Sequence, residues 1–109
     1  MIEKSMGEIK WDATTSHIDA KIRGLNPWPV GYTYYEGNVM KVWLAQAASI
    51  HGETAPAGTI LSVGKEGLVV KTGDGALLIQ EIQMPNKKRM PVSEYIKGNT
   101  LAVGTLLGI

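Results

Sequence analysis

The first regular pattern along the chain is a stripe of apolar residues at helical spacing. Ile18, Ile22 and Leu25 follow one another at intervals of four and three residues, so they fall on one face of a helix. The hydroxyl-bearing residues 14–16 just before the stripe can cap the free amides of a helix start, and Pro27 just after it cannot continue a helix. The pattern therefore predicts an amphipathic helix between these two signals.

After residue 31 the apolar residues alternate with polar ones, as they do in extended chain. Residues 32–36 run into Glu36-Gly37-Asn38, which is a turn signal, and the alternation continues over residues 39–48. This predicts a hairpin of two strands. The second strand is predicted to have one face with Met40, Val42 and Leu44 and an opposite face with Val39, Lys41 and Trp43.

Three more extended segments follow a loop of mostly small residues at 50–57. The extended segments are residues 58–63, 68–72 and 76–82, and the glycine-containing turns between them are residues 64–67 and 73–75. Short strands at regular spacing with glycine turns are typical of a small closed or partly closed barrel.

The C-terminal part combines a short helix with a last extended segment. Pro91-Val92-Ser93 offers a helix start with Ser93 as the cap, and Gly98-Asn99 ends the helix soon afterwards. Residues 101–107 are the candidate for a final short strand, with Gly104 as a turn or bulge. The fold class that follows is mainly β, with one N-terminal helix and a short C-terminal helix.

The composition fits one cysteine-free domain over residues 1–109. The absence of cysteine excludes a disulfide framework, a thiolate metal site and a cysteine nucleophile. Apolar stretches such as 76–82 and 101–109 are far shorter than the roughly 20 residues that span a bilayer. Residues 1–10 lack the apolar run of a signal peptide. We therefore expect a soluble, cytoplasmic protein with no membrane partner.

Positive charge is concentrated near the end of the chain. The net charge is only +1, but residues 1–86 carry −2 and residues 87–109 carry +3. Lys87, Lys88 and Arg89 stand in succession, and no acidic residue occurs between residues 83 and 93 to balance them. Phosphate is the anion that such a run fits best, because contacts to a nucleic-acid backbone release counterions. A solvated loop that serves only solubility is the alternative.

Other lysines extend this cationic group if the barrel brings them to the same side. The predicted nucleic-acid-binding residues are Lys87, Lys88, Arg89, Lys97 and Lys41, with Lys71 as a further candidate.

No catalytic or metal-binding constellation can be assembled from the sequence. His17 and His51 are the only histidines and have no suitably spaced acidic partners, so no metal site is predicted. Ser16 lies directly before His17, but neighbours on a helix point in different directions, so they are not a nucleophile and its base. No phosphate-binding glycine motif occurs. Four carboxylates could be considered as an acid and a base, but their spacing does not pair them, so they are predicted to be solvated or to cap helices: Asp12, Asp19, Asp74 and Glu94.

Trp28 lies between two prolines that hold the backbone extended, in Asn26-Pro27-Trp28-Pro29. Two roles fit this placement. The indole is either an aromatic plug between the helix and the barrel or an exposed platform on which a base stacks.

The chain resembles the C-terminal domain of methionyl-tRNA formyltransferases from about Ser5 to its end. The most specific segments are Asn26-Pro27-Trp28-Pro29 and the strand start at Gly73-Asp74-Gly75. Further matching segments are Lys41-Val42-Trp43-Leu44-Ala45, Gly58-Thr59-Ile60-Leu61, Gly67-Leu68-Val69-Val70 and Lys87-Lys88-Arg89-Met90.

The resemblance implies an OB-like barrel that helps to grip initiator Met-tRNA. A separate N-terminal domain would bind formyl-tetrahydrofolate and carry the catalytic residues, so no cofactor and no catalytic role is expected within this chain. A structural or protein-interaction barrel of a formyltransferase with another substrate is the alternative, with Trp28, Trp43 and the tyrosines at 32, 34 and 35 as its contact residues.

Overall fold

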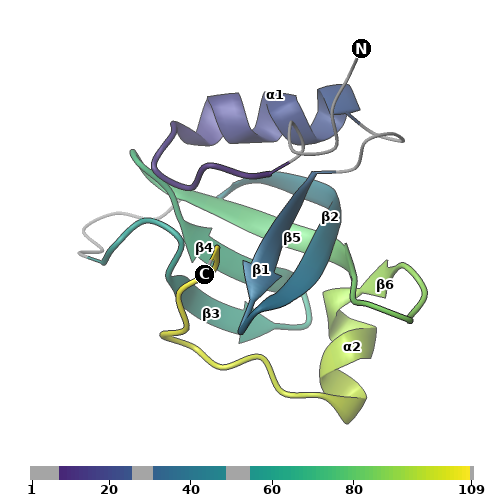
Figure 1. Ribbon diagram of the computed structural model, residues 1–109. Helices are drawn as coiled ribbons and strands as arrows, with labels where there is room; N and C mark the ends of the chain where they lie inside the picture. The colour runs from purple at the N-terminus through teal and green to yellow at the C-terminus, as the bar shows by residue number, and fades with distance from the viewer. Residues whose placement is uncertain (1–7, 26–30, 49–54, 109) are drawn as a thin grey trace.

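A single curled antiparallel sheet forms the centre of the protein. One helix lies across one end of the sheet, and a shorter helix lies beside the sheet, away from the first helix (Figure 1). The computed structural model describes residues 8–25, 31–48 and 55–108. The elements are α1 (Thr15–Leu25), β1 (Tyr32–Tyr35), β2 (Asn38–Ala48), β3 (Ile60–Gly64), β4 (Gly67–Lys71), β5 (Ala76–Gln83), β6 (Met90–Pro91) and α2 (Val92–Gly98). The predictions for Trp28 and His51 fall outside the described residues.

The sheet has the strand order β1-β2-β5-β4-β3, and the two-residue strand β6 pairs with β5. Between β3 and β1 the C-terminal segment completes the barrel wall. The amide of Leu107 donates to the carbonyl of Gly58, and the amide of Gly108 donates to the carbonyl of Tyr34, both at 2.8 Å. The expectation of a mainly β, OB-like barrel with two helices is therefore confirmed.

The predicted last strand over residues 101–107 is reduced to a single bridge between Thr59 and Leu106. Gly104 has a φ of +93°, so the chain turns there as expected. The segment therefore joins the barrel through a few hydrogen bonds and forms no regular strand.

The barrel interior holds the inward residues of every long strand. Met40, Val42, Ile60, Leu68, Val70, Leu77, Ile79 and Ile82 are all fully buried. Ile18 and Ile22 of α1 are also buried, so the helix closes one end of the barrel with the apolar stripe that the sequence predicts. Thr14 Oγ1 accepts a hydrogen bond from the amide of His17 at 3.2 Å, which confirms the helix start.

The predicted face of β2 is wrong at Leu44. Its side chain is 44% exposed, whereas Ala45 is 8% exposed and faces the core. The register between β2 and β5 shifts between Val42 and Leu44 and again between Leu44 and Ala45. Because a β-bulge inserts a residue into one strand, it breaks the simple alternation on which the prediction depends.

The second helix starts two residues earlier than the sequence suggests. Pro91 occupies the N-cap position with a φ of −62°, and no side chain caps the helix there, so Ser93 is not the cap. The backbone of Pro91 pairs with Glu81 on β5, which fixes where the strand ends and the helix begins. A strand of two residues such as β6 leaves no periodic signal in the sequence.

Asp74 caps the first helix from the turn between β4 and β5. Its Oδ1 accepts hydrogen bonds from the amide of Thr15 at 2.8 Å and from Thr15 Oγ1 at 3.1 Å. Thr72 Oγ1 lies 2.7 Å from Thr15 Oγ1 and accepts a hydrogen bond from the amide of Gly75. This network ties the helix start to a turn almost 60 residues away, which confirms a capping role for this carboxylate.

We expect Asp74→Ala to lower the Tm at neutral pH. The amide of Thr15, above all, holds the pKa of Asp74 below its ordinary value of 3.8, so the folded state favours the ionised form. This stabilisation is present above pH 3.8 and is lost as the pH falls through the lower folded-state pKa. The Tm difference between wild type and variant should therefore shrink on acidification. Thermal unfolding from pH 7 downwards measures it, with the exposed Asp12→Ala as control; a difference independent of pH would contradict the assignment.

Candidate nucleic-acid interface

The outer face of β2 and β5 carries the first part of the candidate site. Met40 and Val42 point inward, so Lys41 between them points outward. Lys41 lies opposite Gln83 at the end of β5, and directly opposed residues of an antiparallel pair share one face. The register therefore places Lys41 beside the point where the chain leaves β5.

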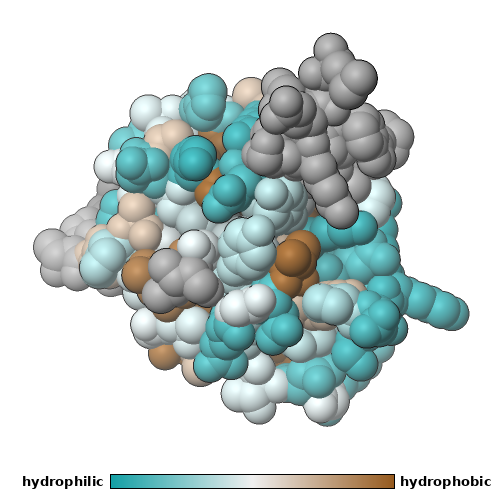
Figure 2. Space-filling model, viewed as in Figure 1, coloured by the Kyte–Doolittle hydropathy of each residue, from teal (hydrophilic) through white to brown (hydrophobic). Residues whose placement is uncertain are grey.

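Residues 84–89 connect β5 to β6 and are called the basic loop here. The amide of Lys87 donates to the carbonyl of Met84 at 3.1 Å, and Asn86 has a φ of +63°, so the loop begins with a tight turn. Its three cationic side chains are exposed. Figure 2 shows a mainly hydrophilic surface over this connection and α2, on the right of the view.

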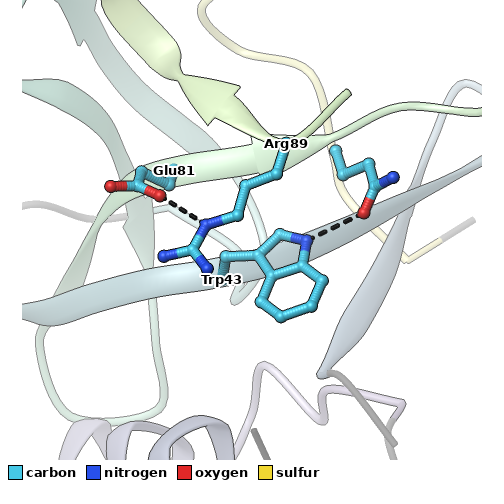
Figure 3. Close-up of polar contacts among 4 residues, drawn as sticks. Trp43, Glu81 and Arg89 are labelled. Atoms are coloured by element: carbon cyan, nitrogen blue, oxygen red, sulfur yellow. Dashed lines mark hydrogen bonds and ion pairs between the residues drawn. The ribbon is translucent and has the colours of Figure 1, made fainter. Parts of the chain in front are cut away.

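Arg89 forms an ion pair with an acidic residue that lies outside the acid-free stretch of residues 83–93. Its Nε donates to Glu81 Oε1 at 2.6 Å, and its Cζ lies 4.8 Å from the centre of the Trp43 ring (Figure 3). The expectation of three unbalanced cations is therefore wrong for Arg89. Glu81 precedes the acid-free stretch in the sequence, but β6 folds back along β5 and brings it close.

Lys87 and Lys88 have no ion pair within the part of the chain that the structure describes. Lys97 on α2 does have one, because its Nζ lies 2.9 Å from Glu94 Oε1. Lys71 lies opposite Ala76 at the start of β5, whereas the basic loop follows the end of that strand. The structure thus brings Lys41 to the loop, leaves Lys87 and Lys88 unpaired among the described residues, and places Lys71 elsewhere.

Three residues of this site are not predicted from the sequence to belong to a nucleic-acid interface, although Trp43 is a predicted contact residue of the alternative protein-interaction role. Trp43, Glu81 and Gln83 all contact the basic loop or hold a residue that does. Their position on one outer face follows from the pairing of β2 with β5, which the sequence pattern does not specify. The matching spacing of Glu81 and Gln83, two residues apart on one strand, is the only local signal for a shared face.

Outside this surface, the described residues show little that suggests a catalytic or metal-binding site. No group of three or more histidine or acidic side chains among them is placed to hold a metal ion, and His17 is exposed on α1. Asp19 pairs with Arg23 at 3.2 Å on the same helix. Neither helix in the described part of the chain has the length and apolar content needed to cross a membrane.

Comparisons with known proteins agree with this architecture. Residues 1–100 match the family described as formyl transferase, C-terminal domain. Methionyl-tRNA formyltransferases of Clostridioides difficile and Acetivibrio thermocellus are 48% and 43% identical to the chain over 108 residues. These matches cover 99% of the chain but 35% of each relative, so the chain spans about a third of their length.

A solved structure of HypX from Aquifex aeolicus in complex with tetrahydrofolic acid also matches, with a TM-score of 0.72 and 16% identity. The match covers 87% of this chain and 17% of that chain. At this level of identity the likeness concerns the fold alone.

Proposed function

This chain belongs to the formyl transferase C-terminal domain family, and we propose that it docks initiator Met-tRNA through the sugar-phosphate backbone. The observation that carries the proposal is the pair of exposed lysines, Lys87 and Lys88, on a loop that is held to the sheet and adjoins Lys41. Two unpaired cations on an ordered loop can neutralise neighbouring phosphates without reading the base sequence. The names of the relatives include methionyl-tRNA, and the resemblance described above implies that it is the initiator.

The proposal assigns the chemistry to another part of the enzyme. The relatives are about three times as long as this chain, which leaves room in them for a separate catalytic domain. We propose that such an N-terminal domain binds formyl-tetrahydrofolate and transfers the formyl group, while the barrel presents the tRNA. The cytoplasmic location expected from the sequence stays a prediction.

A protein-interaction role through the aromatic residues receives less support. Tyr35 is buried, and its hydroxyl accepts a hydrogen bond from the amide of Ala102, so it belongs to the core and the earlier grouping with Tyr32 and Tyr34 is wrong for this residue. Trp43 holds the basic loop.

Titration of initiator tRNA at two salt concentrations tests the proposal. We expect a Kd on the order of 10⁻⁴ to 10⁻⁶ M at physiological salt, with weaker binding as salt rises. Absence of a salt-dependent complex would contradict the proposed tRNA-docking role. Size-exclusion chromatography with light scattering would then show whether the barrel binds a second copy of the chain.

We expect Glu81→Gln to tighten tRNA binding about 1.4- to fivefold. Glu81 competes with phosphate for Arg89. An exposed ion pair of this kind is worth roughly 0.2–1 kcal/mol, and the variant does not have to give up this free energy when it binds tRNA. Asp19→Asn is the control, because it removes the acid of another arginine ion pair, on α1 and away from the loop (Figure 1); the side chain of Asp19 is 18% exposed and that of Glu81 is 27% exposed. Equal tightening in both variants would show that only net charge matters.

A further inference from the structure

One indole is connected to the basic loop directly through Arg89 and indirectly through Gln83. Trp43 Nε1 donates a hydrogen bond to Gln83 Oε1 at 2.9 Å, and Gln83 Nε2 donates to the carbonyl of Lys87 at 3.0 Å. The guanidinium of Arg89 lies over the same indole, 4.8 Å from the ring centre (Figure 3). Trp43 therefore reaches both the turn of the loop and its last residue.

The chemistry of these groups fixes the direction of the chain of hydrogen bonds. An indole N–H can only donate, so the Gln83 amide must turn its oxygen toward Trp43. Its NH₂ group then faces the loop, where the carbonyl of Lys87 can only accept. Without the indole, the Gln83 amide has no such constraint and can rotate away from the loop.

A backbone irregularity places Trp43 in this position. The register of β2 against β5 runs from Val42 opposite Ile82 to Leu44 opposite Glu81, so Trp43 is the extra residue of a β-bulge. Bulges re-aim a side chain and increase the local twist of a strand. The indole consequently lies over the end of β5, where the basic loop begins.

We propose that Trp43 is a positioning residue, which orders the basic loop so that Lys87 and Lys88 meet the tRNA backbone together. The inference rests on the proposed function, and it adds a residue that carries no charge. Prior ordering of the loop reduces the entropy lost on binding, because the turn that carries the two lysines is already formed in the free protein. Arg89 adds to the ordering through its contact with the ring.

Two variants of the 109-residue chain separate the contacts, and a third variant bypasses Trp43. Trp43→Phe keeps an aromatic face for Arg89 but removes the N–H donor, whereas Trp43→Leu removes both. Gln83→Met breaks the link to Lys87 while leaving the indole in place. Gln80→Met is the control, since Gln80 lies on the same strand, whereas the side-chain hydrogen bonds between that strand and the loop, among the described residues, involve Gln83 and Glu81.

Affinity for initiator tRNA should fall about threefold in Trp43→Phe and Gln83→Met and about tenfold in Trp43→Leu. The slope of log affinity against log salt should stay at the wild-type value, because no phosphate-contacting charge is removed. Gln80→Met should bind as wild type does. A loss of affinity in Trp43→Phe with none in Gln83→Met would show direct contact of the indole with the nucleic acid and would overturn the positioning role.

Hydrogen exchange of the free protein gives a readout that does not depend on RNA. Residues 84–90 should exchange faster in Trp43→Leu and Gln83→Met than in wild type, while residues 67–71 of β4 keep their protection. Unchanged exchange in the loop would overturn the inference, as would faster exchange with unchanged affinity. If the wild-type chain binds no tRNA, the proposed function itself fails and the inference falls with it.

Discussion

The double variant Lys87→Ala/Lys88→Ala is expected to lose roughly thirtyfold in affinity for initiator tRNA at about 0.1 M monovalent salt. Each cation that contacts a phosphate contributes about 0.7–0.9 of a decade through counterion release under these conditions, and two such contacts are removed. Both side chains are exposed, so the free energy of unfolding should change by less than about 0.5 kcal/mol. Mobility-shift titration measures the affinity, and thermal unfolding checks the fold.

The choice of two lysines avoids a second effect. Removing Arg89 as well would leave Glu81 without its ion-pair partner beside the bound backbone. The variant Lys10→Ala/Lys65→Ala is the control, because it removes the same formal charge from exposed lysines that lie outside the basic loop and have no ion pair among the described residues. A loss of equal size in the two double variants would point to net charge and away from the basic loop.

The largest effect on stability is expected for Gly67→Ala, at about 3–5 kcal/mol. Gly67 opens β4 with a φ of +142°, a backbone conformation that side chains strongly disfavour. A Cβ at this position would also collide with the carbonyl oxygen of Ile79 on the paired strand β5. Strain and collision act together, so the Tm should fall by roughly 20 °C.

Gly64→Ala provides a control from the same hairpin. Gly64 pairs with Gly67 at the end of β3, but a Cβ there meets no atom within 4 Å. Its effect should stay within about 0.5 kcal/mol. Circular dichroism during thermal unfolding measures both variants, and similar Tm values for the two would refute the conformational argument for Gly67.

Local patterns in the sequence were sufficient for most of the elements. The stripe through Ile18 and Ile22 predicted α1, and the turn at Glu36-Gly37 predicted the hairpin, where both turn residues have positive φ. Leu44 was assigned to the wrong face because a bulge depends on pairing with another strand. The prediction of a regular last strand over residues 101–107 is wrong for the same reason, since that segment's hydrogen bonds go to residues such as Tyr34, far away in sequence.

Of the candidate site, only the run of cationic residues could be predicted from the sequence. The run from Lys87 to Arg89 is visible in any reading of the sequence, but the ion pair with Glu81 requires β6 to fold back along β5. The anchoring of the loop by Trp43 requires both a bulge and the pairing of β2 with β5. Such contacts depend on tertiary structure, so the periodicity of the sequence does not predict them.

The salt dependence of tRNA binding tests the central claim most directly. Affinities of the wild-type chain and of Lys87→Ala/Lys88→Ala should be measured between about 0.05 and 0.2 M salt and compared as slopes of log affinity against log salt. If the two lysines contact phosphates, the slope of the variant will be shallower by about 1.4–1.8. Parallel lines for the two proteins would contradict a phosphate-docking role for the basic loop.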